Sequence, residues 1–157
     1  MYSMSKAPDE IDCRIIEILE RQGRSSISDV GKEVGLSAPA VGERLRSLQS
    51  NGYITGFAAQ FDLRKFGYAI QALVRVKPRS GQLHIVERMI EEEDRFISCH
   101  RVTGDDCYVG RLLLKEISEL DEILLPFHDR AETNTSIIKS IMFEDRLPKL
   151  EFGQTAL

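Results

Sequence analysis

The feature that most restricts the fold of this chain is a short turn, Val34-Gly35-Leu36-Ser37, between two helical patterns. Apolar residues at helical spacing precede the turn at Val30 and Val34 and resume after it at Val41. Gly35 can adopt the left-handed backbone conformation that a sharp bend requires. A bend of this kind between two short helices is typical of a helix-turn-helix, in which the second helix braces the third.

Three helices are expected in this half of the chain. The first begins at Asp9 and ends at Gly23, and acidic residues in its first turn suit the helix dipole. The second begins after Ser28, which is a good N-cap. The third runs from about Ala38 to Ser50 with Ser37 as its cap. Residues 53–61 follow as an extended connecting strand, so the sequence predicts a winged module.

The second half alternates strand-like and helix-like patterns. Turn-forming residues from Thr103 to Asp106 predict a hairpin, and Ser118 with Asp121 predicts a capping pair. The expected elements are a strand over 68–77, a helix around 83–90, strands over 96–102 and 108–114, a helix around 118–127 and a strand over 137–143.

This order predicts an α+β protein: an N-terminal winged helix-turn-helix domain followed by a ferredoxin-like βαββαβ domain. The expected boundaries are residues 1–54 for the helix-turn-helix domain, 55–67 for the connecting strand and linker, and 68–157 for the ferredoxin-like domain. The chain has 157 residues, and two domains of this size are each marginal alone, so association is expected.

The third helix is the expected DNA-reading element. Its N-terminal residues are small, so the helix could lie deep in a major groove, and its arginines could reach phosphates or guanine edges. The expected contacts on this helix are Ser37, Ala38, Pro39, Ala40, Glu43, Arg44, Arg46 and Ser47. Candidates for contacts to the DNA backbone outside it are Arg24, Ser26 and Lys32.

The charge distribution leaves a second interpretation open. The net charge is −4, and residues 1–60 hold seven Lys and Arg against eight Asp and Glu, so DNA binding requires a local patch. A small helical domain that binds protein, joined to a ligand sensor, would also suit this balance. The acidic residues gather in the first helix, however, while Arg44 and Arg46 lie on the third, which favours DNA.

The run IDCRIIEILERQGRSSISDVGKEVGLSAPAVGERLRSLQSNGYITGF resembles the N-terminal domain of the leucine-responsive and asparagine regulator (Lrp/AsnC) family. The resemblance continues through Gly67-Tyr68 to about Arg146. The matching features are Asp12 before the paired isoleucines, Gly23-Arg24, Val34-Gly35-Leu36-Ser37, Val41, Arg44-Leu45, Leu48 and Gly52-Tyr53-Ile54.

The resemblance implies a bacterial or archaeal, cytoplasmic transcription regulator without a cofactor. Family members dimerise through the sheet of the C-terminal domain, and dimers often assemble into octameric rings. The implied partners are a second copy of the chain and double-stranded DNA with a pseudo-palindromic operator. In many members a small effector, usually an amino acid, binds between dimers beside the turn after the second strand of that domain.

In this chain the implied effector turn is Val102-Thr103-Gly104-Asp105-Asp106. Gly104 would let a ligand approach the backbone, and Asp105 or Asp106 could pair with an α-ammonium group. The family often has a Thr-x-Thr stretch entering the last strand. Ser136-Ile137-Ile138 aligns there, so Ser136 and Ile138 are the further effector candidates, although Thr133 and Thr135 lie just upstream.

Two other functions remain open from the sequence, and a third, metal sensing, is not expected. One is a tetrapyrrole (siroheme-type) decarboxylase with the same two-domain layout, for which only His84, His100 and His128 could serve. Another is an architectural DNA-binding regulator that needs no effector. Metal sensing by Cys99, His100 and Cys107 would use soft ligands. Cys99 and His100 are neighbours on a strand, however, and point to opposite faces, so no metal site is expected.

Overall fold

A computed structural model describes residues 7–151 of the chain. The described residues form two compact units, one made of residues 7–59 and 143–151 and the other of residues 60–142. Each unit has its own hydrophobic core. The boundaries expected at residues 54 and 67 stay predictions. No pattern in the sequence indicated that residues 143–151 belong with the N-terminal unit.

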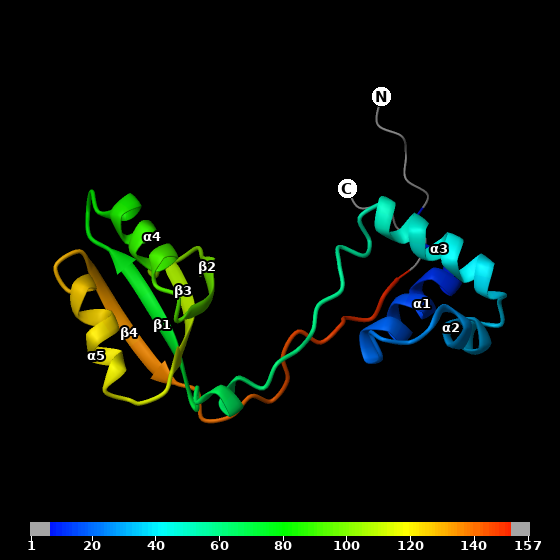
Figure 1. The fold of residues 1–157 in the computed structure, drawn as a ribbon. Coiled ribbons are helices and arrows are strands. Elements are labelled where there is room, and N and C mark those ends of the chain that lie inside the picture. Colours follow the sequence, from blue (N-terminus) through cyan, green and yellow to red (C-terminus); the bar gives the residue numbers. More distant parts are fainter. Residues whose placement is uncertain (1–6, 152–157) are drawn as a thin grey trace. The chain divides into compact units, whose positions relative to one another are not determined.

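The N-terminal unit contains three helices, α1 (Glu10–Arg21), α2 (Ile27–Val34) and α3 (Ala38–Ser50), shown in blue to cyan in Figure 1. Their apolar faces close one small core, as the helical spacing of the sequence predicts. The buried members of this core are Ile15, Ile18, Val30, Val34, Val41 and Leu48. The expected three-helix pattern is therefore confirmed.

The helix starts differ in detail from the expectation. Ser26 rather than Ser28 caps α2, because its hydroxyl oxygen accepts a hydrogen bond from the backbone N–H of Asp29. Ser37 occupies the N-cap position of α3, as expected, but its side chain makes no capping hydrogen bond. Pro39 lies in the first turn of α3, where its missing N–H carries no cost.

The expected wing is not formed in the single chain. Residues 55–62 have no regular secondary structure, and a short 3-10 helix, η1 (Leu63–Phe66), follows them. A strand needs a neighbour to satisfy its backbone groups, and residues 55–62 pair with no strand in the part of the chain that the structure describes. The strand was expected from the apolar residues Ile54, Phe57 and Ala59, and the side chain of Phe57 is exposed.

The second unit is a four-stranded antiparallel sheet with two helices. The strand order is β2-β3-β1-β4, and the βαββαβ order confirms the expected C-terminal fold. The elements are β1 (Ile70–Pro78), α4 (Leu83–Glu92), β2 (Phe96–Arg101), β3 (Tyr108–Leu114), α5 (Glu119–Leu124), the 3-10 helix η2 (Leu125–Phe127) and β4 (Ala131–Ile137).

Both helices pack on the same face of the sheet, where they form the core of this unit (Figure 1). Ala72, Val74 and Val76 of β1 point into that core and are fully buried. Residues between them on β1, such as Leu73 and Arg75, therefore lie on the opposite face. No helix within residues 60–142 joins the core from that opposite face, which is called the helix-free face below.

Two expectations for the end of this unit are wrong. The last strand covers Ala131–Ile137 rather than residues 137–143, because Ala131 to Ile137 pair in register with β1. The apolar run that suggested a later strand lacks this neighbour. The capping pair of Ser118 with Asp121 is also absent: Ser118 makes no side-chain capping bond, and the carboxylate of Glu119 accepts from the backbone N–H of Lys115 instead.

Candidate nucleic-acid interface and effector turn

The turn between α2 and α3 depends on two glycines. Gly35 ends α2 in the left-handed conformation, with φ at 75°, as the sequence predicts. Gly31 has a separate role that the sequence did not reveal. A Cβ atom on Gly31 would lie 2.6 Å from the carbonyl oxygen of Leu36. The turn can therefore fold back onto α2 only because residue 31 has no side chain.

α3 presents one face to the core and the other away from it. Val41 and Leu48 are buried, whereas Ala38, Pro39, Glu43, Arg46 and Ser47 are exposed and Ala40 is half-buried. The exposed residues are small near the N-terminus of the helix and polar further along. This outer face is the surface that could enter a major groove.

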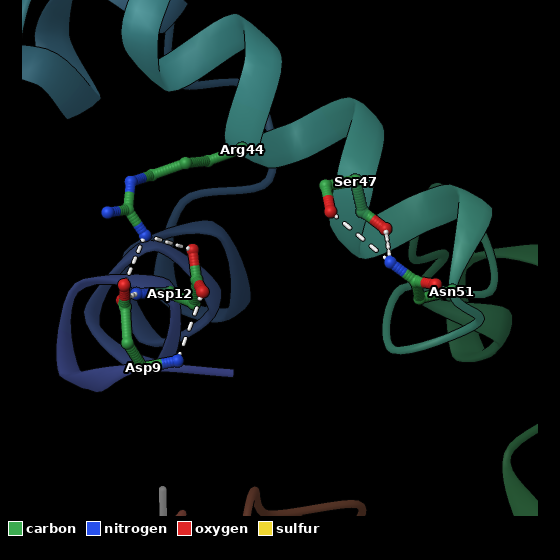
Figure 2. Close-up of polar contacts among 5 residues, drawn as sticks. All are labelled: Asp9, Asp12, Arg44, Ser47 and Asn51. Carbon is green, nitrogen blue, oxygen red and sulfur yellow. Dashed lines mark hydrogen bonds and ion pairs between the residues drawn. The ribbon is translucent and has the colours of Figure 1, made fainter. Parts of the chain in front are cut away.

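Arg44 does not belong to that outer face. Its Nη1 atom donates hydrogen bonds to Asp9 Oδ2 and to Asp12 Oδ1, both at 2.7 Å (Figure 2). Asp9 and Asp12 also form the capping box of α1, since each accepts a hydrogen bond from the backbone N–H of the other. Arg44 thus ties α3 to the first turn of α1. The sequence signal for this pairing was the acid pair in the first helix.

Hydrogen bonds in this cluster favour the charged forms of Asp9 and Arg44. Partial burial opposes ionisation of Asp9, but hydrogen bonds from Arg44 and from the backbone of Asp12 outweigh it and hold the pKa of Asp9 below its usual value. The same two carboxylates raise the pKa of Arg44. Figure 2 also shows Asn51, whose side-chain N–H donates to the carbonyl and hydroxyl oxygens of Ser47 near the end of α3.

The residues outside α3 that were expected to contact the DNA backbone lie around the N-terminus of α2. Arg24 and Ser26 line a hollow of about 610 Å³ there, together with Gln22, Gly23, Ser25 and Asp29. Backbone N–H groups at a helix N-terminus suit a phosphate. Lys32 is less available, since its Nζ atom lies 2.8 Å from Asp29 Oδ1. That contact and the hydroxyl of Ser26 lower the pKa of Asp29.

The expected hairpin between β2 and β3 is confirmed. The backbone N–H of Val102 donates to the carbonyl of Cys107 at 2.9 Å, and Gly104 has φ at 109°, which suits glycine. Thr103, Gly104 and Asp105 are exposed. Asp106 Oδ2 lies 3.7 Å from Nε of Arg75, whereas Asp105 has no polar partner among the described residues.

The base of this hairpin is held from the helix side. The hydroxyl of Tyr108 donates to Glu87 Oε1 of α4 at 2.6 Å, and Arg101 Nη1 lies 3.6 Å from the same oxygen. Burial and the adjacent carboxylate of Glu87 raise the pKa of Tyr108 to about 12. The ends of β2 and β3 are therefore anchored while the tip of the turn stays exposed.

Within one chain, Ser136 and Ile138 do not come close to this turn. The turn adjoins Val76 of β1, whereas Ser136 pairs with Leu73 and the N–H of Ile138 donates to Gln71 at the other end of the strand. At about 3.3 Å per residue these points are roughly 10–17 Å apart. The part of β4 that lies nearest the turn is its first half, where Thr133 pairs with Val76. This half of β4 contains the Thr-x-Thr spacing at Thr133 and Thr135.

Two further residues near the turn, Arg75 and Asn134, were not identified from the sequence. Arg75 lies in the middle of β1, and its Nη1 atom donates to the side-chain oxygen of Asn134 on β4 at 3.4 Å. In a strand of alternating apolar and polar residues, an arginine is predicted only to face solvent. Its place beside the turn follows from the pairing of β1 with both β3 and β4, which no local pattern encodes.

The residues considered for other chemistries are dispersed. No group of three or more metal-ligating side chains occurs among residues 7–151. Cys99 pairs with Gly110 and His100 with Val109, so these side chains point to opposite faces of β2. His84 lies on α4 and His128 follows η2. None of the helices in residues 7–151 has the length and apolar character needed to span a membrane.

Comparisons with known proteins agree with this architecture. The AsnC-type helix-turn-helix domain matches residues 9–49, and the Lrp/AsnC ligand binding domain matches residues 71–148. The HTH-type transcriptional regulator FL11 of Pyrococcus horikoshii is 31% identical over 116 residues, which cover 74% of this chain and 77% of that protein. The regulator LrpC of Bacillus subtilis is 27% identical over 132 residues, 84% of this chain and 92% of LrpC.

Solved structures give the same result in three dimensions. The structure of B. subtilis LrpC has a TM-score of 0.79 at 26% identity and covers 88% of this chain and 99% of its own. A feast or famine regulatory protein from Mycobacterium tuberculosis, solved in complex with L-methionine, has a TM-score of 0.79 at 26% identity. The match covers 89% of this chain and 97% of that one.

A helix-turn-helix domain joined to a ligand-binding type of α+β domain defines a DNA-binding transcription regulator. Within that class, the chain belongs to the Lrp/AsnC family. The resemblance that the sequence suggested is therefore confirmed. The relatives named above, LrpC and FL11, are both described as HTH-type transcriptional regulators.

Proposed function

We propose that the protein binds a pseudo-palindromic operator as a dimer and that the outer face of α3 reads the DNA sequence. The observation that carries this proposal is that the two arginines of α3 differ in their partners. Arg44 is held by Asp9 and Asp12. Arg46 is exposed and has no polar partner among the described residues, so it is the cation of α3 that is available to DNA.

The other contacts follow from the shape of this face. The small residues Ala38, Pro39 and Ala40 let the helix approach the floor of the groove, and Ser37 and Ser47 can donate to phosphates or base edges. Glu43 can accept from the amino group of cytosine. Arg24 and Ser26 supply backbone contacts at the N-terminus of α2, where a phosphate is favoured.

Arg44 acts in this proposal as a positioning residue and does not touch DNA. It sets the position of α3 against α1, and Asp9 and Asp12 neutralise its charge. The module therefore has few free cations, so each DNA contact is weak and several linked modules are needed. We propose that the helix-free face of the sheet forms the dimer and that dimers assemble further, up to an octamer, as the family resemblance implies.

We further propose an amino-acid effector at the turn formed by Val102, Thr103, Gly104, Asp105 and Asp106. The M. tuberculosis relative in complex with L-methionine supports this ligand class. Asp105 is the better acceptor for the α-ammonium group, because Asp106 already faces Arg75. Ser136 and Ile138 can contribute only from a neighbouring copy of the chain, which agrees with a site between dimers.

The DNA proposal is tested with the intact protein on the region upstream of its own gene. A gel shift at two salt concentrations should show binding that weakens as salt increases. The absence of a salt-sensitive shift up to micromolar protein would contradict it.

The effector proposal is tested separately by a thermal-shift screen of the twenty amino acids, since a specific ligand stabilises the state that it binds. L-methionine is the first probe. Asp105→Asn should abolish the shift given by any amino acid that stabilises the wild type. If the shift is unchanged in this variant, the site lies elsewhere.

A further inference from the structure

Arg75 lies at a crossing point of the C-terminal sheet. It is on β1, next to β3 on one side and β4 on the other, and pairs with Val109 and Asn134. Its neighbours Val74 and Val76 point into the core, so the side chain of Arg75 lies on the helix-free face. Its position therefore allows contact with residues from both flanking strands.

The guanidinium group makes use of that position. Nε lies 3.7 Å from Asp106 Oδ2 in the β2–β3 turn, and Nη1 donates to Asn134 Oδ1 on β4 at 3.4 Å. A guanidinium group can make both contacts because its donors are fixed in one plane, which a lysine ammonium cannot reproduce. Asp106, Arg75 and Asn134 thus form a continuous polar chain from the turn to β4.

Both contacts are long, and the side chains of Arg75 and Asp106 are 37% and 41% exposed. Contacts of this length are weak, so a modest movement of the turn is enough to break or shorten them. The tightly held Arg44 cluster, with two contacts of 2.7 Å, offers no such freedom. The Arg75 chain is therefore suited to transmitting a change.

We propose that Arg75 is a positioning residue that couples the β2–β3 turn to β4 and to the helix-free face. A displacement of the turn moves Asp106, Asp106 moves the guanidinium group, and the hydrogen bond to Asn134 changes in response. This inference rests on the proposed function in one respect: an amino acid held by Asp105 would be the natural cause of the displacement. The coupling itself is a property of the chain without ligand.

The consequence is a route from the turn to the surface that we propose for dimer formation. Asn134 lies on the same face as Arg75, because the two residues are paired across the strands. A ligand at the turn could then alter how two copies pack without touching that surface. Allosteric coupling requires two arrangements of a connecting element, and the guanidinium group of Arg75 supplies that element.

The first test needs no ligand. Methyl-detected NMR spectra of the full-length protein, labelled on valine and threonine, report the turn through Val102 and β4 through Thr133 and Thr135, which flank Asn134. Asp106→Asn should shift the signals of both regions. Asp105→Asn removes the same charge one residue away and should shift only Val102. Equal effects of the two variants on Thr133 and Thr135, or none from Asp106→Asn, would overturn the proposal.

The second arm uses a double-variant cycle. In an Arg75→Gln background, adding Asp106→Asn should no longer shift Thr133 and Thr135, because the connection is already lost. Arg75→Lys keeps the charge and should not restore the effect. Arg88→Gln, on the exposed surface of α4, removes a charge of the same sign and should leave the effect of Asp106→Asn intact. Persistence of that effect in the Arg75→Gln background would show that another path carries it.

A titration with L-methionine separates the inference from the proposed function. In the wild type, binding should shift Val102, Thr133 and Thr135, whereas in Arg75→Gln it should shift Val102 alone. If L-methionine shifts none of these signals in the wild type, the effector proposal fails for this probe. The ligand-free variants still decide whether Arg75 couples the turn to β4.

Discussion

The two candidate sites of this chain are built in opposite ways. In the N-terminal unit, Arg44 fixes α3 through two contacts of 2.7 Å, and the DNA-reading face itself makes few polar contacts. In the C-terminal unit, backbone hydrogen bonds hold the base of the exposed turn, and the side-chain contact of Asp106 with Arg75 on the sheet face is an ion pair of 3.7 Å. The proposed DNA-reading surface is thus held in position by short contacts, whereas the side chains of the proposed effector turn make longer ones. The predictions below test this contrast, beginning with the largest effect.

The largest effect is expected at the α2–α3 turn. Gly31→Ala places a methyl group 2.6 Å from a backbone carbonyl, which cannot move without opening the turn. We expect a loss of about 2–4 kcal/mol in the free energy of unfolding, measured by urea denaturation.

Gly42→Ala is the matched control, because the nearest atom to its new Cβ is Ile27 Cδ1 at 3.9 Å. It should be neutral or stabilise by up to about 1 kcal/mol. Equal destabilisation by the two substitutions would mean that the close approach at Gly31 is not what fixes the turn.

The next effect separates the two arginines of α3. Arg44→Met should lower the free energy of unfolding by about 1–2 kcal/mol, since it leaves Asp9 and Asp12 without their cation in a partly exposed setting. Arg46→Met should leave it within about 0.5 kcal/mol. Thermal or urea unfolding of both variants distinguishes them. An Arg44 variant as stable as the wild type would return this residue to the DNA-reading face.

A smaller effect concerns pH. The pKa of Asp9 is lowered in the folded protein, so the ionised carboxylate stabilises the fold at pH above its unfolded value of about 4. That contribution disappears as the pH falls through the folded pKa. The difference in unfolding free energy between the wild type and Asp9→Asn should therefore be constant near pH 7 and shrink below about pH 4.

Glu20→Gln, which removes a charge from the exposed side of α1, controls for net charge in the same pH series. A difference between the wild type and Asp9→Asn that stays constant down to the acid transition would argue against the Arg44 pairing.

The sequence predicted most of the fold because the relevant signals are local. Helical spacing, the turn at Gly35 and the hairpin at Gly104 all appear as predicted. The wing failed because a strand depends on a neighbour, and β4 was misplaced because its register is set by β1. The side-chain pairs at the two sites could not be predicted for the same reason, because their members are far apart in the sequence. Arg44 and Asp9 are 35 residues apart, and Arg75 and Asn134 are 59 apart.

The most direct measurement of the central claim is fluorescence anisotropy with a duplex from the gene's own upstream region. The wild type, Arg46→Met and the surface control Arg88→Met should be compared over a range of salt concentrations. We predict that Arg46→Met weakens binding by roughly tenfold and lowers the salt dependence by about one ion per protomer, while Arg88→Met changes neither. The same affinity and the same salt dependence for all three proteins would contradict the assignment of α3 as the DNA-reading helix.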